Sequence, residues 1–60
     1  MGCAERKQEK LLDAAEAKLT EEKYSEATEL LRKVISLNPE SKLGIKSMYK
    51  LGHTLETYGR

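Results

Sequence analysis

Residues 24–39 read YSEATELLRKVISLNP, and this stretch decides the fold. Its apolar residues recur at intervals of three and four, which predicts one broad face of an α-helix. That face is formed by Ala27, Leu30, Leu31, Val34, Ile35 and Leu37. Ser25 can accept a backbone N–H bond as an N-cap, and Pro39 drives Asn38 out of the helical region. We therefore expect a core helix over residues 25–38.

The preceding segment, residues 4–20, contains no Gly or Pro and is rich in residues of high helix propensity. One narrow apolar stripe runs along it and consists of Ala4, Leu11, Leu12, Ala15 and Leu19. Polar residues 20–23 interrupt the stripe and predict a turn. We expect a first helix over 4–20 that packs antiparallel on the core helix, with Ala15 and Ala27 allowing close approach.

A third helix is expected over residues 41–58, with Ser41 as its N-cap. Its apolar stripe consists of Ile45, Met48, Tyr49, Leu55 and Tyr58, with Gly52 on the same face. Gly44 and Gly52 each cost up to about 1 kcal/mol relative to alanine inside a helix. We expect Gly52 to bring a neighbouring helix close. The fold class is all-α, with an antiparallel helix hairpin and a third helix in a single domain, residues 1–60.

Composition limits what the chain can do. Its 60 residues can bury only roughly 60% of the unfolded surface, so self-association or further repeats would help it fold. One cysteine allows no internal disulfide, and one histidine with one thiol cannot form a four-ligand zinc site, so we expect no metal or cofactor. No apolar run approaches the roughly 18 residues of a membrane span.

From Leu11 to Pro39 the chain resembles a tetratricopeptide repeat (TPR). The matching positions, which the family uses for packing, are Ala15, Tyr24, Ala27, Leu31, Val34 and Pro39. Leu51 and Gly52 resemble the Leu-Gly pair of a following repeat, so the match covers about one and a half repeats. The resemblance implies a right-handed superhelical stack. Four positions depart from the family pattern: Leu11, Ala14, Lys18 and Glu22 stand for its usual Trp, Leu, Tyr and Gly.

The step from Ala15 to Gly52 is 37 residues, three more than the family period. This longer step is similar to the repeats of bacterial outer-membrane assembly lipoproteins. In the TPR family, the outward flank of each repeat's first helix lines a concave groove. The resemblance therefore implies a partner-binding groove formed by Leu12, Glu16, Thr20, Lys46, Tyr49, Lys50 and His53.

The function expected from this groove is that of a protein-interaction module or scaffold. Lys42, Lys46 and Lys50 recur every four residues along one flank, which suits an acidic peptide or partner helix. Nucleic acid is a poorer match, because the lysines lack interleaved aromatic residues or arginines. No enzyme is expected, since a fragment this small has little room for a pocket that holds several reacting groups.

Two other functions stay open. Exposed stripes on the second and third helices could pair two chains into a homodimer. A three-helix trafficking domain of the microtubule-interacting type is the other, although the Leu51-Gly52 pair argues against it. A cytoplasmic location is favoured, with a periplasmic or membrane-anchored one as the alternative. The anchor would be Cys3, in a Met1-Gly2-Cys3 start that resembles a lipidation signal but fits a cloning remnant better.

Overall fold

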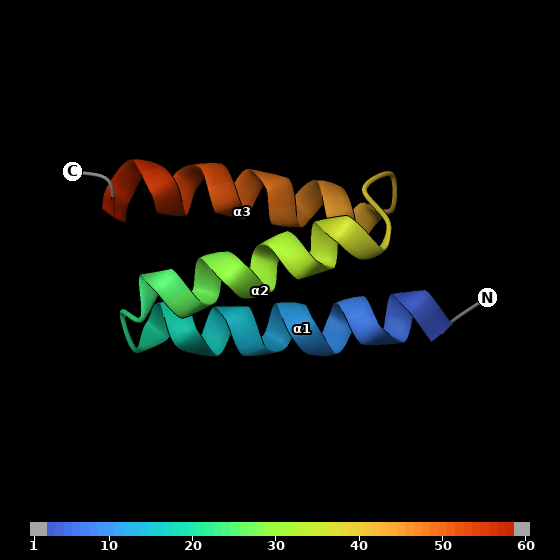
Figure 1. Cartoon of the computed structure of the whole chain (residues 1–60), viewed down its shortest axis with the longest axis horizontal. Helices are drawn as coiled ribbons and strands as arrows, with labels where there is room; N and C mark the ends of the chain where they lie inside the picture. The colour runs from blue at the N-terminus through green and yellow to red at the C-terminus, as the bar shows by residue number, and fades with distance from the viewer. Residues whose placement is uncertain (1–2, 59–60) are drawn as a thin grey trace.

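The computed structural model describes the backbone of residues 3–58 and the side chains of residues 6–57. Over this range the chain forms three helices: α1 (Cys3–Thr20), α2 (Tyr24–Leu37) and α3 (Lys42–Tyr58). Figure 1 shows α2 between α1 and α3, antiparallel to both. The described residues contain no strand, so the expected all-α hairpin with a third helix is confirmed. Each helix begins and ends within one residue of the range expected from the sequence.

The turn between α1 and α2 is closed by backbone hydrogen bonds. The Lys23 N–H donates to the Lys18 carbonyl oxygen (2.8 Å) and the Glu22 N–H to the Leu19 carbonyl oxygen (3.0 Å). This pair of bonds is the Schellman motif, and it requires a left-handed residue, which is Glu22 with φ 63°. Ser25 is not the cap that the sequence predicted, because α2 begins one residue earlier and Lys23, its N-cap, makes no side-chain cap bond.

The apolar core belongs mainly to the α1–α2 hairpin. Among the side chains that the structure describes, the buried apolar ones all come from these two helices: Leu12, Ala15, Ala27, Leu31 and Val34. Four half-buried leucines pack against the core cluster: Leu11, Leu30, Leu43 and Leu51. Ala15 and Ala27 are fully buried, which is consistent with the close helix approach expected there. The core face of α2 is thus the one predicted from the sequence, except that Leu37 is exposed.

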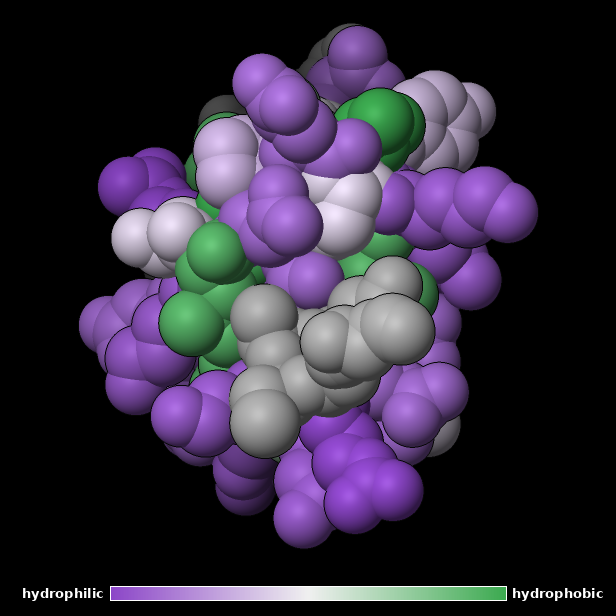
Figure 2. All heavy atoms as spheres, turned by 90° about the vertical axis from the view of Figure 1, so that its right-hand side faces the viewer, coloured by the Kyte–Doolittle hydropathy of each residue, from purple (hydrophilic) through white to green (hydrophobic). Residues whose placement is uncertain are grey.

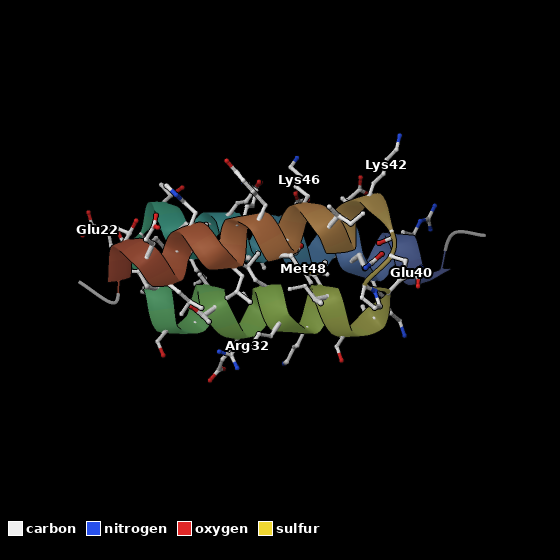
Figure 3. The ribbon with its side chains drawn as sticks, turned by 90° about the horizontal axis from the view of Figure 1, so that it is seen from above. Glu22, Arg32, Glu40, Lys42, Lys46 and Met48 are labelled. Carbon is white, nitrogen blue, oxygen red and sulfur yellow. The ribbon has the colours of Figure 1, made fainter. Side chains whose placement is uncertain are left out.

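The buried face of α3 differs from the one predicted. It presents Gly44, Ser47 and Thr54 to the hairpin, while those apolar residues of the expected stripe whose side chains are described lie at the surface. Those exposed residues are Ile45, Met48, Tyr49 and Leu55. In Figure 3, Lys42 and Lys46 project on the side of α1, whereas Met48 lies on the side of α2. The third helix therefore packs through a small and partly polar face.

Close approach involves Gly44 and not Gly52. A Cβ at Gly44 would collide with the Asn38 carbonyl oxygen, whereas a Cβ at Gly52 would meet no atom within 4 Å. Gly52 is exposed, so assigning it to internal packing was wrong. Pro39 is exposed as well and acts by ending α2, with Asn38 held in an extended conformation ahead of it.

The turn between α2 and α3 is fixed by Gln8, a residue of α1. The fully buried Gln8 amide donates to the Val34 carbonyl oxygen (2.8 Å) and to the Asn38 carbonyl oxygen (3.1 Å). The Ser41 hydroxyl lies 3.0 Å from Gln8 Oε1 and accepts from the Gly44 N–H at 3.0 Å, so Ser41 is the expected cap of α3. A polar side chain of α1 thereby ties the end of α2 to the start of α3.

Candidate partner-binding groove

A groove of about 320 Å³ lies between the last turns of α1 and the middle of α3. We call it the α1/α3 groove, and it is lined by Leu19, Lys46, Tyr49, Lys50, His53 and Thr54. The four α3 residues expected from the family resemblance all line it. They share one flank of α3 because their spacing of three and four residues matches the helical period.

An ion pair beside this groove joins Lys50, which lines it, to Glu16 of α1, which does not. The Lys50 ammonium lies 3.2 Å from a Glu16 carboxylate oxygen, and both side chains are partly exposed. The expected groove residues Glu16 and Lys50 are therefore brought together. Lys46, one turn away, makes no ion pair with any residue whose side chain the structure describes, and it is exposed. It is the cation that a ligand would meet first.

Two α1 residues of the expected groove are not available there. Leu12 is only 4% exposed and belongs to the core, because its position on α1 points toward Leu31 and Val34. Thr20 is exposed but does not line the groove, and its hydroxyl donates to the Glu16 carbonyl oxygen at 3.0 Å. The α1 wall is provided instead by Leu19, which the sequence placed on the packing stripe.

Tyr49 dominates the surface of the groove. Its side chain is 81% exposed, the largest exposure among the exposed large apolar residues. An aromatic ring with so little contact in its own fold offers a large apolar area at low entropic cost to a partner. His53 lies one turn further along the same flank and is also exposed.

A second and larger groove, of about 510 Å³, lies between α1 and α2 near the start of α1. This α1/α2 groove has Leu11 and Leu37 as apolar residues and three lysines around them, Lys7, Lys10 and Lys33, together with Ser36. The sequence did not predict this groove, because its lysines lie on two different helices. Figure 2 shows the end of the molecule where α1 begins, and most of that surface is hydrophilic with small separate apolar areas.

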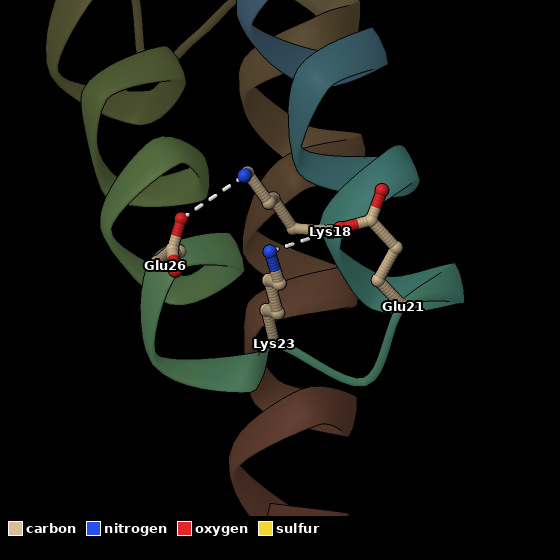
Figure 4. A network of polar contacts seen from close by, with 4 residues as sticks. All are labelled: Lys18, Glu21, Lys23 and Glu26. Atoms are coloured by element: carbon tan, nitrogen blue, oxygen red, sulfur yellow. Dashed lines mark ion pairs between the residues drawn. The ribbon is translucent and has the colours of Figure 1, made fainter.

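Ion pairs at the opposite end of the hairpin join charged residues of α1, the turn and α2 (Figure 4). Lys18 lies 3.0 Å from Glu26, and Lys23 lies 3.4 Å from Glu21. The hydrogen bond to Lys18, followed by the attraction of its charge, lowers the pKa of Glu26. The same contact raises the pKa of Lys18. These pairs support the hairpin and do not line either groove.

No protein-family model matches the chain, and no curated protein or solved structure shows significant similarity to it. The function is therefore inferred from the residues and their geometry. Among the described residues there is no cluster of three or more His, Cys, Asp or Glu that could hold a metal ion. No described helix is long and apolar enough to cross a membrane. Met1, Gly2 and the side chains of Cys3, Ala4 and Tyr58 lie outside the described residues.

Proposed function

We propose that the chain is a TPR-like protein-interaction module that binds a short acidic segment of another protein in the α1/α3 groove. One observation supports this most directly. Exposed Tyr49, Lys46 and His53 converge with Leu19 and Lys50 on a single concavity. Apolar anchors beside cations suit a ligand that carries both leucine-like and carboxylate side chains.

The Glu16–Lys50 pair gives the groove a way to discriminate between ligands. Glu16 partly neutralises Lys50 at 3.2 Å, so a ligand carboxylate must compete with Glu16 for that ammonium. Lys46 has no such competitor among the described side chains and can pair with a ligand directly. A basic ligand would be repelled by Lys46 and would gain only Glu16, so the groove favours acidic segments.

The proposal is tested with a short synthetic peptide of glutamates and leucines as the probe. In an NMR titration, amide signals of residues 46–53 and of Leu19 should move, and a matched peptide of lysines and leucines should leave them in place. K46E should weaken binding by roughly tenfold or more, because it replaces an attraction by a repulsion of like charges.

The matched control is K33E, which makes the same charge reversal in the α1/α2 groove. It should leave the affinity for the acidic peptide nearly unchanged. Equal losses in K46E and K33E would show a general charge effect and would overturn the assignment to the α1/α3 groove. A loss in K33E alone would move the binding site to the α1/α2 groove.

A further inference from the structure

The outer face of α3 carries an apolar stripe that the rest of the described fold covers only in part. We call it the α3 seam, and it consists of Ile45, Met48, Gly52 and Leu55. The three apolar side chains are 58%, 46% and 42% exposed. Their spacing of three, four and three residues is the a/d pattern of a coiled coil, the pattern with which one helix packs along another.

Gly52 stands in the middle of this seam and has no role within its own fold. A Cβ there would meet open space, although glycine inside a helix costs up to about 1 kcal/mol relative to alanine. Glycine on a helix face permits a second helix to come closer than a side chain would allow. Within the described fold, nothing fills the space beside Gly52.

We propose that two copies of the chain pair antiparallel through the α3 seam. The a and d positions of antiparallel helices face each other, so Ile45 packs against Leu55 of the second copy. Met48 then lies over Gly52 of the second copy, and the same contact occurs twice because the pairing is two-fold. A long flexible side chain thus fills the space that each glycine leaves open.

The charges that flank the seam favour a second, antiparallel copy of the chain as its partner. Lys42, Tyr49 and Glu56 flank the seam on one side at intervals of seven residues. In the antiparallel register Lys42 lies beside Glu56 of the second copy, twice per pair, and the two Tyr49 rings meet near the axis. In a parallel register Gly52 would face Gly52, and neither Lys42 nor Glu56 would gain an oppositely charged neighbour across the seam.

The pairing does not depend on the proposed peptide-binding role. Met48 of the seam lies on the α2 side of α3, whereas Lys46 projects on the α1 side (Figure 3). Lys46, Lys50 and His53 therefore remain open to a ligand when the seam is covered. Tyr49 lies between the two surfaces, so pairing would leave one edge of the α1/α3 groove next to the second copy.

The first test is the oligomeric state, measured by sedimentation equilibrium over a range of protein concentrations. The wild-type chain should approach twice its monomer mass of 6.8 kDa. M48E, which would bury a charge over Gly52, should remain a monomer. L37E is the matched control, since Leu37 is exposed to the same extent as Leu55 but lies on α2 away from the seam, and it should still pair. A wild-type monomer at every concentration overturns the proposal, as does a dimer disrupted by L37E but not by M48E.

The orientation is tested by charge exchange. K42E and E56K should each raise the dissociation constant of the homodimer by roughly tenfold, because two attractions become repulsions. Mixed together, the two variants should pair with each other, because every Lys42–Glu56 contact then joins opposite charges again. The double variant K42E/E56K should also recover pairing. A mixture that pairs no better than either single variant would overturn the antiparallel register.

Gly52→Ala separates folding from association. The added methyl meets open space within one chain, so the dilute monomer should melt at a higher temperature than wild type. Association should weaken by roughly tenfold, because the methyl occupies the place of Met48 of the second copy. If association strengthened or stayed the same, the role of Gly52 in the pairing would be refuted. A melting temperature below that of wild type would contradict the statement that a methyl group at position 52 meets open space within one chain.

Discussion

The two interfaces made by α2 are built from different side chains. Toward α1, α2 buries an apolar cluster with Leu31 and Val34 fully enclosed. Toward α3, the contact relies on half-buried Leu43 and Leu51, on the small residue Gly44, and on a polar turn held by Gln8. Burial of apolar area is the main source of stability in folding, so the α1–α2 contact should contribute more to stability than the α2–α3 contact.

This difference suggests two roles for the helices. The hairpin uses most of its apolar residues internally, and among the described large apolar residues that are exposed only Leu37 belongs to it. The third helix packs inward through Leu43 and Leu51 together with small and polar residues. It leaves its other described large apolar residues at the surface, a pattern that is expected when a helix has a second partner. The proposed groove and the proposed seam lie on either side of this one helix. The following variants test the contrast, beginning with the largest expected effect.

Leu31→Ala should come close to unfolding the chain. Loss of a buried leucine side chain costs about 2–5 kcal/mol, and a domain of this size has only about 3–9 kcal/mol of stability. Leu55→Ala on α3 is the control, because Leu55 is 42% exposed and should cost less than about 1 kcal/mol. Urea denaturation followed by circular dichroism, at concentrations where the chain is dilute, measures both. Similar losses in the two variants would remove the distinction between the hairpin and α3.

Gln8→Ala should loosen α3 selectively. The variant removes one donor from each of the Val34 and Asn38 carbonyl oxygens, of which the Asn38 oxygen still accepts from Ser41, and should cost about 1–3 kcal/mol. Hydrogen exchange should speed up in α3 more than in the middle of α1. Lys10→Ala, an exposed change on the same helix, is the control and should have little effect. If exchange rose equally along all three helices, Gln8 would be a general core residue with no special link to the α2–α3 turn.

Much of this contrast could not be predicted from the sequence. The hairpin core was predictable, because the apolar pattern of residues 27–34 fits only one helix face. The face of α3 was not, because its apolar residues surround the helix and two different stripes fit the period. The collision at Gly44 is a tertiary feature that favours one of them.

Parts of the α2–α3 turn and of the candidate groove were not predicted for similar reasons. From the sequence, Gln8 would be placed at the surface. The residues around it do not indicate that its amide donates to two carbonyl groups of α2 and the following turn. Leu12 and Leu19 lie on one expected stripe, but Leu12 packs against Leu31 and Val34 of α2, whereas Leu19 lines the α1/α3 groove. The α3 flank was easier to predict, since the spacing of Lys46, Tyr49, Lys50 and His53 puts them together on any straight helix.

Ser47→Ala should stabilise the chain by about 1 kcal/mol. The Ser47 hydroxyl is fully buried and has no hydrogen-bond partner, so its burial carries a desolvation cost that alanine removes. Alanine also has the higher helix propensity. Ser36→Ala, an exposed change on α2, gives the propensity gain alone and serves as the control. If Ser47→Ala lowered the stability while Ser36→Ala raised it, the Ser47 hydroxyl would have a hydrogen-bond partner.

The smallest expected effect is a pH dependence at the Lys18–Glu26 pair, which joins α1 to α2. The folded-state pKa of Glu26 lies below its ordinary value of 4.5, so the contribution is present above that value and is lost as the pH falls through the folded pKa. The pKa of Lys18 lies above 10.5, so the contribution is also lost as the pH rises through that higher folded pKa. The pair should therefore stabilise the hairpin across the neutral range.

Melting temperatures measured between acidic and neutral pH should show this at Glu26→Gln. The variant should lie below wild type at neutral pH and converge with it in acid, where wild-type Glu26 is itself protonated. Glu29→Gln, an exposed carboxylate of the same helix with no ion pair among the described side chains, should follow wild type throughout. Added salt should shrink the gap at Glu26, because both side chains of the pair are exposed to screening. A gap that persisted in acid would mean that Glu26 acts through packing and that the ion pair adds nothing to the hairpin.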